Sequence, residues 1–120
     1  MKKISKLSRY SVFHTLCKDT GLFVEKRINN LLYYAYVEND LDENKLLAVF
    51  SCGTINRATK VHECLDGTLV LCERIDIFPD VEVMEEQYDE EVKNIRELVK
   101  QWKLAKIEKR KENMNKDFRQ

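Results

Sequence analysis

Residues that interrupt regular structure are scarce in this 120-residue chain, which has three glycines and one proline. Because Gly21, Gly53 and Gly67 lie far apart, they cannot build a glycine-rich loop for phosphate. The chain also lacks any run approaching the roughly 20 apolar residues of a membrane-spanning helix. Lys6 and Arg9 interrupt the N-terminal segment, which therefore lacks the apolar core of a secretory signal peptide. We expect a cytoplasmic protein that does not enter a membrane.

Four cysteines and two histidines are present, but without the spacing of a metal site. Structural zinc sites use ligand pairs separated by about two to four residues, whereas His62 and Cys64 have one residue between them. From a two-residue turn at Asp66-Gly67 we expect Cys72 to face the opposite side of its hairpin. We predict no metal and no other cofactor, with reduced thiols that pack as small apolar groups.

The chain shows no arrangement typical of a catalytic site. His62-Glu63-Cys64 resembles the start of a deaminase motif, but the P-C-x-x-C part that must follow is absent. His14 and Cys17 lie about one helical turn apart, and this spacing alone does not supply the geometry of a nucleophile and its base. We therefore expect no catalytic residues and no enzymatic activity.

Helical and strand-like periods follow one another along the first two thirds of the chain. Apolar residues recur every three to four positions up to Cys17, and Gly21 stands where a helix-capping glycine is favoured, which predicts a helix over 5–18. Asn29-Asn30 and Asp66-Gly67 are typical hairpin turns. We expect about five strands in an antiparallel meander: 22–28, 31–37, 45–52, 58–65 and 68–78.

The first predicted hairpin has two distinct faces. A two-residue turn at Asn29-Asn30 would pair Phe23 with Tyr36, and would place Tyr33 and Ala35 on the core side. The opposite side, here called the tyrosine face, would carry Glu25, Arg27, Tyr34 and Tyr36. Such a face could stack nucleobases if it were open. We favour a terminal helix covering it, because two amphipathic helices need a surface on which to pack.

The segment from Met84 to Lys111 contains no glycine or proline, and its residue types sort onto separate faces when wound at about 100° per residue. An apolar arc comprises Tyr88, Val92, Ile95, Leu98, Val99, Trp102 and Ala105. One flank of the helix is basic: Lys93, Arg96, Lys100, Lys103, Lys106 and Arg110. We predict an α+β fold in which this long C-terminal amphipathic helix packs on the sheet, with a short helix at the N-terminus.

Charge is segregated along the chain, although the 21 basic and 21 acidic residues cancel. Residues 80–91 carry seven acidic and no basic residues, while residues 92–120 carry ten basic and four acidic ones. We expect a single domain over 1–110, followed by a frayed basic tail at 111–120. The chain has 14 lysines and 8 asparagines against 4 alanines, which is typical of an AT-rich genome such as that of a phage or mobile element.

These features favour a small interaction protein, such as a phage or mobile-element inhibitor or modulator of a host or defence protein. The expected partner-binding residues carry opposite charges on one helix and include its tryptophan: Glu85, Glu86, Glu90, Lys93, Lys100, Trp102 and Lys103. Trp102 could instead anchor the helix to the sheet. The alternative function is a nucleic-acid-binding regulator that uses the basic flank. A short heptad pattern leaves open whether the chain is a monomer or a homodimer.

Overall fold

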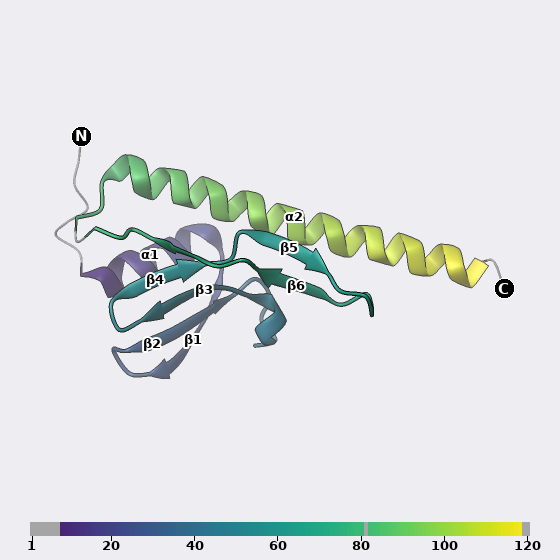
Figure 1. Cartoon of the computed structure of the whole chain (residues 1–120), viewed down its shortest axis with the longest axis horizontal. Helices are drawn as coiled ribbons and strands as arrows, with labels where there is room; N and C mark the ends of the chain where they lie inside the picture. The colour runs from purple at the N-terminus through teal and green to yellow at the C-terminus, as the bar shows by residue number, and fades with distance from the viewer. Residues whose placement is uncertain (1–7, 81, 119–120) are drawn as a thin grey trace.

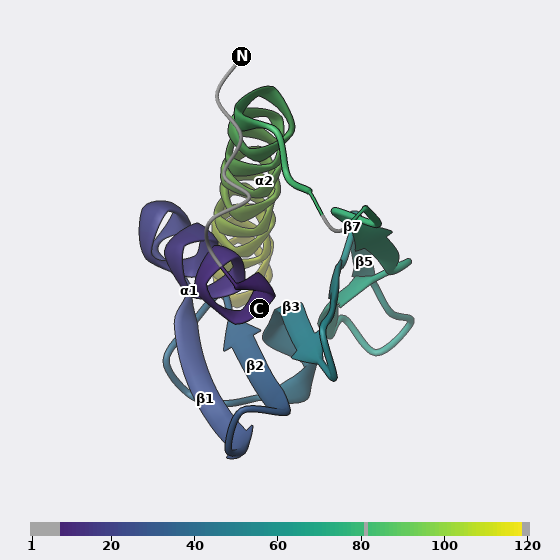
Figure 2. The same ribbon diagram turned by 90° about the vertical axis from the view of Figure 1, so that its left-hand side faces the viewer.

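The computed structural model describes the backbone of residues 8–80 and 82–118, and side chains within these ranges as far as Lys111. The elements in chain order are α1 (Arg9–Thr20), β1 (Phe23–Ile28), β2 (Leu32–Tyr36), the 3₁₀ helix η1 (Glu43–Lys45), β3 (Leu46–Ser51), β4 (Thr54–Arg57), β5 (Lys60–Glu63), β6 (Leu69–Cys72), β7 (Ile75–Ile77) and α2 (Glu85–Phe118). Both helices lie on one side of an antiparallel sheet (Figures 1 and 2). The predicted α+β fold is confirmed. No helix in the described ranges is long and apolar enough to cross a membrane.

The main sheet has five strands in the order β1-β2-β3-β4-β7, and β5 and β6 form a separate hairpin inserted before β7. Strand β4 was not predicted, and the predicted segment 68–78 is divided between β6 and β7. The chain reverses direction between β3 and β4 at Cys52 and Gly53, which have φ of 48° and 86°. Cysteine is not a typical turn residue, so sequence reasoning did not find this hairpin.

Helix α1 is closed at both ends by local hydrogen bonds. The Ser8 hydroxyl accepts from the Ser11 N–H at 3.2 Å, which caps the N-terminus. Gly21 has φ of 72°, and its N–H is directed to the carbonyls of Cys17 and Lys18, so the predicted capping glycine is confirmed. The helix ends two residues later than expected, and residues 5–7 of the prediction lie outside the described residues.

The register of the first hairpin agrees with the prediction as far as Lys26, which pairs with Tyr33. Phe23 pairs with Tyr36 and Val24 with Ala35, as expected. A bulge after Lys26 then pairs Ile28 with Leu32 instead of Leu31, so the loop is three residues long and the predicted two-residue turn is wrong. Asn30 has φ of 64°, a conformation that asparagine tolerates better than most residues.

The second hairpin is out of the predicted register by one residue. Cys72 pairs with Lys60, so it lies on the same side as His62 and Cys64, and the predicted opposite placement is wrong. The Cys64 N–H donates to the carbonyl of Thr68 at 2.8 Å, which makes the loop three residues long instead of two. Within the described residues, no group of three or more His, Cys, Asp or Glu side chains could hold a metal ion.

The core lies between the helices and the Tyr33 side of the sheet. Phe13 of α1 lies with its ring centroid 5.8 Å from that of Phe50 on β3. The predicted apolar arc of α2 faces the same core, where Tyr88, Ile95, Leu98 and Trp102 are buried and Val92 and Val99 are partly buried. Cys17 is buried here too, which raises the pKa of its thiol to about 12 and keeps it protonated.

Neither of the two helices that the structure describes covers the tyrosine face, so the expectation that a terminal helix packs on it is wrong. Both amphipathic helices bury their apolar residues on the opposite side of the sheet, against Tyr33 and Phe50. Of the four side chains that define this face only Tyr36 is buried, and its neighbours on the same face contact it. The Tyr36 hydroxyl donates to Glu25 Oε1 at 3.0 Å, and the Arg27 guanidinium lies 4.7 Å from the centre of the Tyr34 ring.

Candidate binding surface on helix α2

Helix α2 carries every residue that the sequence predicted for partner binding. Its 34 residues correspond to a length of about 50 Å at 1.5 Å per residue. It crosses above the main sheet, continues over the β5–β6 hairpin and extends past that hairpin (Figure 1). Since Ile95, Leu98 and Trp102 face the core, their positions fix which flanks of the helix face solvent.

The end of α1 is tied to α2 by two polar contacts from Asp19. Its carboxylate accepts a hydrogen bond from the Tyr88 hydroxyl at 2.5 Å, and its backbone carbonyl accepts one from the Arg96 guanidinium at 2.9 Å. Burial and the neighbouring Asp19 carboxylate raise the pKa of Tyr88, which therefore remains the protonated donor. These contacts hold the two helices side by side and engage Arg96 within the protein.

An acidic patch lies on the first two turns of α2 and consists of Glu85, Glu86 and Glu90. All three side chains are exposed, and none has an ion-pair partner in the described part of the chain. The next residue, Glu91, is different: its carboxylate binds the buried Arg57 guanidinium at 2.5 Å. Carboxylates in a first turn are favoured by the helix dipole, so Glu85 and Glu86 can be left unpaired without destabilising the helix.

Three exposed lysines follow the acidic patch along α2 and are here called the lysine edge: Lys93, Lys100 and Lys103. They span ten residues, or about 15 Å of helix. No hydrogen bond or ion pair engages them among residues 8–80 and 82–111, whereas Arg96, between them in sequence, is bound to Asp19. The lysine edge therefore consists of hydrated charges that remain available to a binding partner.

The lysine edge borders a groove of about 390 Å³ between α2 and the end of α1. Thr20 lines it from α1, and α2 contributes two apolar side chains, Val99 and the 52% exposed Leu104. Cations complete the lining: Arg96, Lys100 and Lys103. Because no carboxylate lines this groove, it can accommodate an acidic side chain on an apolar floor.

Trp102 lies away from this exposed surface. It is 2% exposed, and its indole N–H donates to Glu38 Oε2 at 2.8 Å. This arrangement is the anchoring role that the sequence left open for Trp102. Of the seven predicted partner-binding residues, the six charged ones are exposed and the tryptophan is buried. Their participation in binding stays a prediction.

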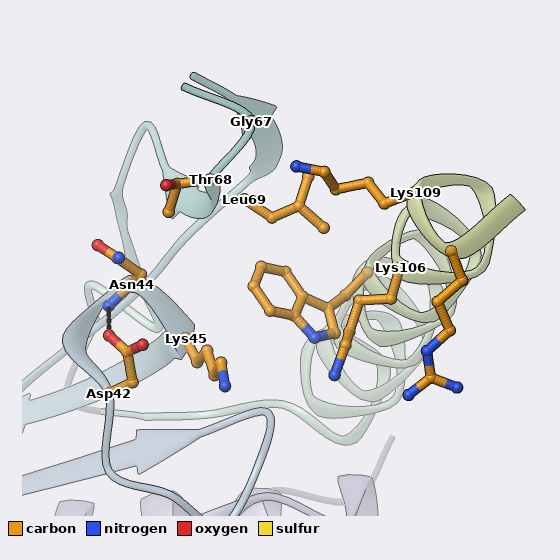
Figure 3. Close-up of a pocket in the computed structure, with 10 residues that line it drawn as sticks. Asp42, Asn44, Lys45, Gly67, Thr68, Leu69, Lys106 and Lys109 are labelled. Atoms are coloured by element: carbon orange, nitrogen blue, oxygen red, sulfur yellow. Dashed lines mark hydrogen bonds between the residues drawn. The ribbon is translucent and has the colours of Figure 1, made fainter. Parts of the chain in front are cut away.

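A second cleft, of about 290 Å³, lies between α2, η1 and the tip of the β5–β6 hairpin (Figure 3). Lys106 donates to both carboxylate oxygens of Glu38, at 2.8 and 2.9 Å, and Lys45 lies 3.8 Å from the same group. The hydrogen bond from Lys106 holds the pKa of Glu38 below its ordinary value. Lys109 lies 3.6 Å from Glu63 on the hairpin.

The cations of this cleft differ from the lysine edge because three of them already have carboxylate partners. Lys106 and Lys109 connect α2 to the loop after β2 and to the hairpin. Lys45 binds Glu38 and Asp40 of the same loop from η1, and Arg110 is exposed at the rim. We interpret the cleft as a polar brace that positions the second half of α2. Sequence reasoning missed Glu38, because nothing local marks a residue whose partners on α2 are more than 60 positions away along the chain. It also missed Lys45, although its partners Glu38 and Asp40 are close in sequence.

Comparison of the chain with protein-family models, curated proteins and solved structures finds no match.

Proposed function

We propose that the protein is a small, cytoplasmic, non-enzymatic interaction protein that binds a partner protein through the charged surface of α2. We expect the partner to be a host or defence protein, which a phage or mobile-element protein of this kind would inhibit or modulate. One observation carries the proposal: the acidic patch and the lysine edge are free of ion pairs within the described residues. Charges on α2 that face the protein body, such as Glu91 and Lys106, are paired.

The order of charges along α2 predicts the charge pattern of the partner's binding surface. The acidic patch comes first and the lysine edge second, so a complementary partner presents a basic region followed by an acidic one. Such complementarity accelerates association and selects against partners with the reverse pattern. The groove beside Lys100 and Lys103 would receive a carboxylate side chain, with Leu104 contributing apolar contact.

The test is quantitative affinity capture from lysate of a low-GC bacterium with four forms of the protein. We expect a partner that binds the unmodified chain to be lost with the triple variant Lys93→Glu, Lys100→Glu and Lys103→Glu. Neutralising the acidic patch (Glu85→Gln, Glu86→Gln, Glu90→Gln) should also weaken capture. Lys60→Glu on the hairpin is the matched control and should have no effect. Capture that survives both triple variants would contradict the proposal.

A second candidate function is nucleic-acid binding, which the unpaired lysine edge favours. Three free lysines along about 15 Å of helix could contact successive phosphates. The nearby acidic patch opposes this function, because it would repel the same backbone. Fluorescence anisotropy with short single- and double-stranded DNA and RNA distinguishes nucleic-acid binding from protein binding. Binding that weakens steeply with salt and is lost in the lysine triple variant would favour nucleic acid, and no binding at low salt would exclude it.

A further inference from the structure

The main sheet has an unpaired edge at β1. This strand is the first in the sheet order and pairs only with β2. Figure 2 shows β1 at the border of the sheet, below α1, with no described strand beyond it. An edge strand leaves alternate backbone N–H and C=O groups without a strand partner, and these groups can accept an added strand.

A groove of about 630 Å³ lies between this edge and α1. Tyr10 and Tyr33 line it with their rings 4.8 Å apart, and Leu22 and Val24 add apolar surface. Val24 is paired with Ala35, a core-side residue, so it belongs to the helix side of the sheet, which faces the groove. A strand placed beside β1 would therefore direct every second side chain into this space.

The charge of the groove is positive. Lys18 from α1 and Lys26 from β1 line it, and no carboxylate does. Neither lysine has an ion-pair partner among the residues that the structure describes. Carboxylates on the incoming strand would supply the counter-charges that the groove lacks.

Apolar residues at the edge also remain uncovered. Phe23 is 41% exposed on the outer side of β1, and Ile28 is 52% exposed at its end. Lysine in an edge strand normally blocks unwanted pairing, and Lys26 would disfavour a second copy of the same strand, which is itself basic. The carboxylates of an acidic segment would instead be attracted to Lys26. The edge is therefore selective for acidic strands.

We propose that an extended acidic segment of a partner protein adds to the sheet beside β1, with carboxylates directed towards Lys18 and Lys26. The main-chain hydrogen bonds of the added strand supply part of the affinity, and the two lysines supply the selectivity. This surface uses neither the acidic patch nor the lysine edge of α2. It would give the protein a second binding site, independent of the proposed function.

The test uses a fluorescent heptapeptide of alternating glutamate and valine, whose binding to the full chain is followed by anisotropy. We expect binding that becomes about tenfold weaker, or more, in the double variant Lys18→Glu and Lys26→Glu. The same peptide with every backbone nitrogen methylated should not bind to the unmodified protein, because neither of its edges can then donate hydrogen bonds to β1. This peptide arm remains decisive if the double variant does not fold.

Two controls isolate the site. A lysine-valine heptapeptide should not bind, and the variant Lys93→Glu with Lys100→Glu should bind the acidic peptide as the unmodified chain does. Loss of binding in that variant would assign the peptide to the lysine edge of α2 and overturn the proposal. Peptide binding at β1 neither supports nor contradicts the proposed function of α2, which affinity capture tests. The two proposals can therefore fail independently.

Four further outcomes would overturn the proposal. The first is no peptide binding at low salt, and the second is equal binding of the methylated peptide, which would show attraction without strand addition. The third is a stable dimer in sedimentation velocity that excludes the peptide, since a second copy would then occupy the edge. The fourth is binding of a thymidine oligonucleotide that displaces the peptide and that requires Lys18 and Lys26.

Discussion

The two sides of the five-stranded sheet bury side chains through different kinds of contact. On the helix side, apolar side chains from both helices fill the space above the strands, and Ile95 of α2 is fully buried there. On the outer side Tyr36 is just as inaccessible, although no described helix covers it. The Tyr36 hydroxyl donates a hydrogen bond to Glu25, and its oxygen accepts one of 3.4 Å from the Arg27 guanidinium.

This difference shows how a sheet can bury a large side chain on a face that no described helix covers. Long polar side chains lie along the outer face, covering it with their aliphatic parts while their polar ends remain near water. Arg74 does this over β3 and β4, where it donates to the Asn56 side chain at 2.7 Å and to the carbonyls of Leu46 and Leu47. Burial of Tyr36 therefore needs no helix, and α2 can bury its apolar arc on the helix side while presenting charged flanks to solvent.

The largest expected effect comes from the apolar helix side. Replacing Ile95 with alanine should lower the free energy of unfolding by about 2–5 kcal/mol, because it removes buried methyl groups and leaves a cavity. Urea denaturation of the purified variant measures this loss. Leu104→Ala on the same helix is the matched control and should change stability by less than about 0.5 kcal/mol, since Leu104 is largely exposed. Equal losses at both positions would show that the helix side is not the main source of stability.

The buried ion pair on the helix side should give the next largest effect. Glu91→Gln leaves the Arg57 guanidinium buried without its counter-charge, and we expect stability to fall by about 2–3 kcal/mol. The same urea experiment measures it, with Glu90→Gln as the exposed control. A loss below about 0.5 kcal/mol would mean that water reaches Arg57 and that the pair belongs to the surface.

Sequence periodicity predicted those parts of the fold that depend on local spacing. The apolar arc of α2, the capping role of Gly21 and the first hairpin register as far as Lys26 all follow from residues close together in the chain. The turn at Cys52-Gly53 and the loop before Thr68 depend on backbone conformations that their residue types do not specify, so β4 and the second register were missed.

The two proposed binding surfaces, on α2 and at β1, differ in how far local spacing in the sequence predicts them. Exposure of Lys100 and Lys103 follows from their position on α2 opposite the apolar arc. The groove at β1 is formed by α1 and an edge strand, and it exists only because both helices pack on the Tyr33 side of the sheet. The predicted register placed Tyr33 on the core side, but it did not specify that both helices cover that same side, so this groove could be found only in the folded chain.

A smaller effect is expected on the outer side. Tyr36→Phe removes the hydroxyl that donates to Glu25, and we expect a loss of about 1 kcal/mol, typical of one net hydrogen bond. Thermal unfolding followed by circular dichroism can resolve a change of this size. Tyr34→Phe is the control, because Tyr34 contacts Tyr36 and Arg27 with its ring and not with its hydroxyl. If both variants lose nothing, packing alone keeps Tyr36 buried.

The smallest effect should come from Glu38, which follows β2 and binds Trp102 and Lys106 of α2. Its folded-state pKa lies below the ordinary value of about 4.5, so its contribution is complete above that pH and disappears as the pH falls through the lowered pKa. Trp102 is the only tryptophan, so its fluorescence reports protonation of its hydrogen-bond partner directly. We expect a fluorescence transition below pH 4.5 that is absent in Glu38→Gln. A transition that persists in this variant would assign the acid response to other carboxylates and remove Glu38 from the brace that positions α2.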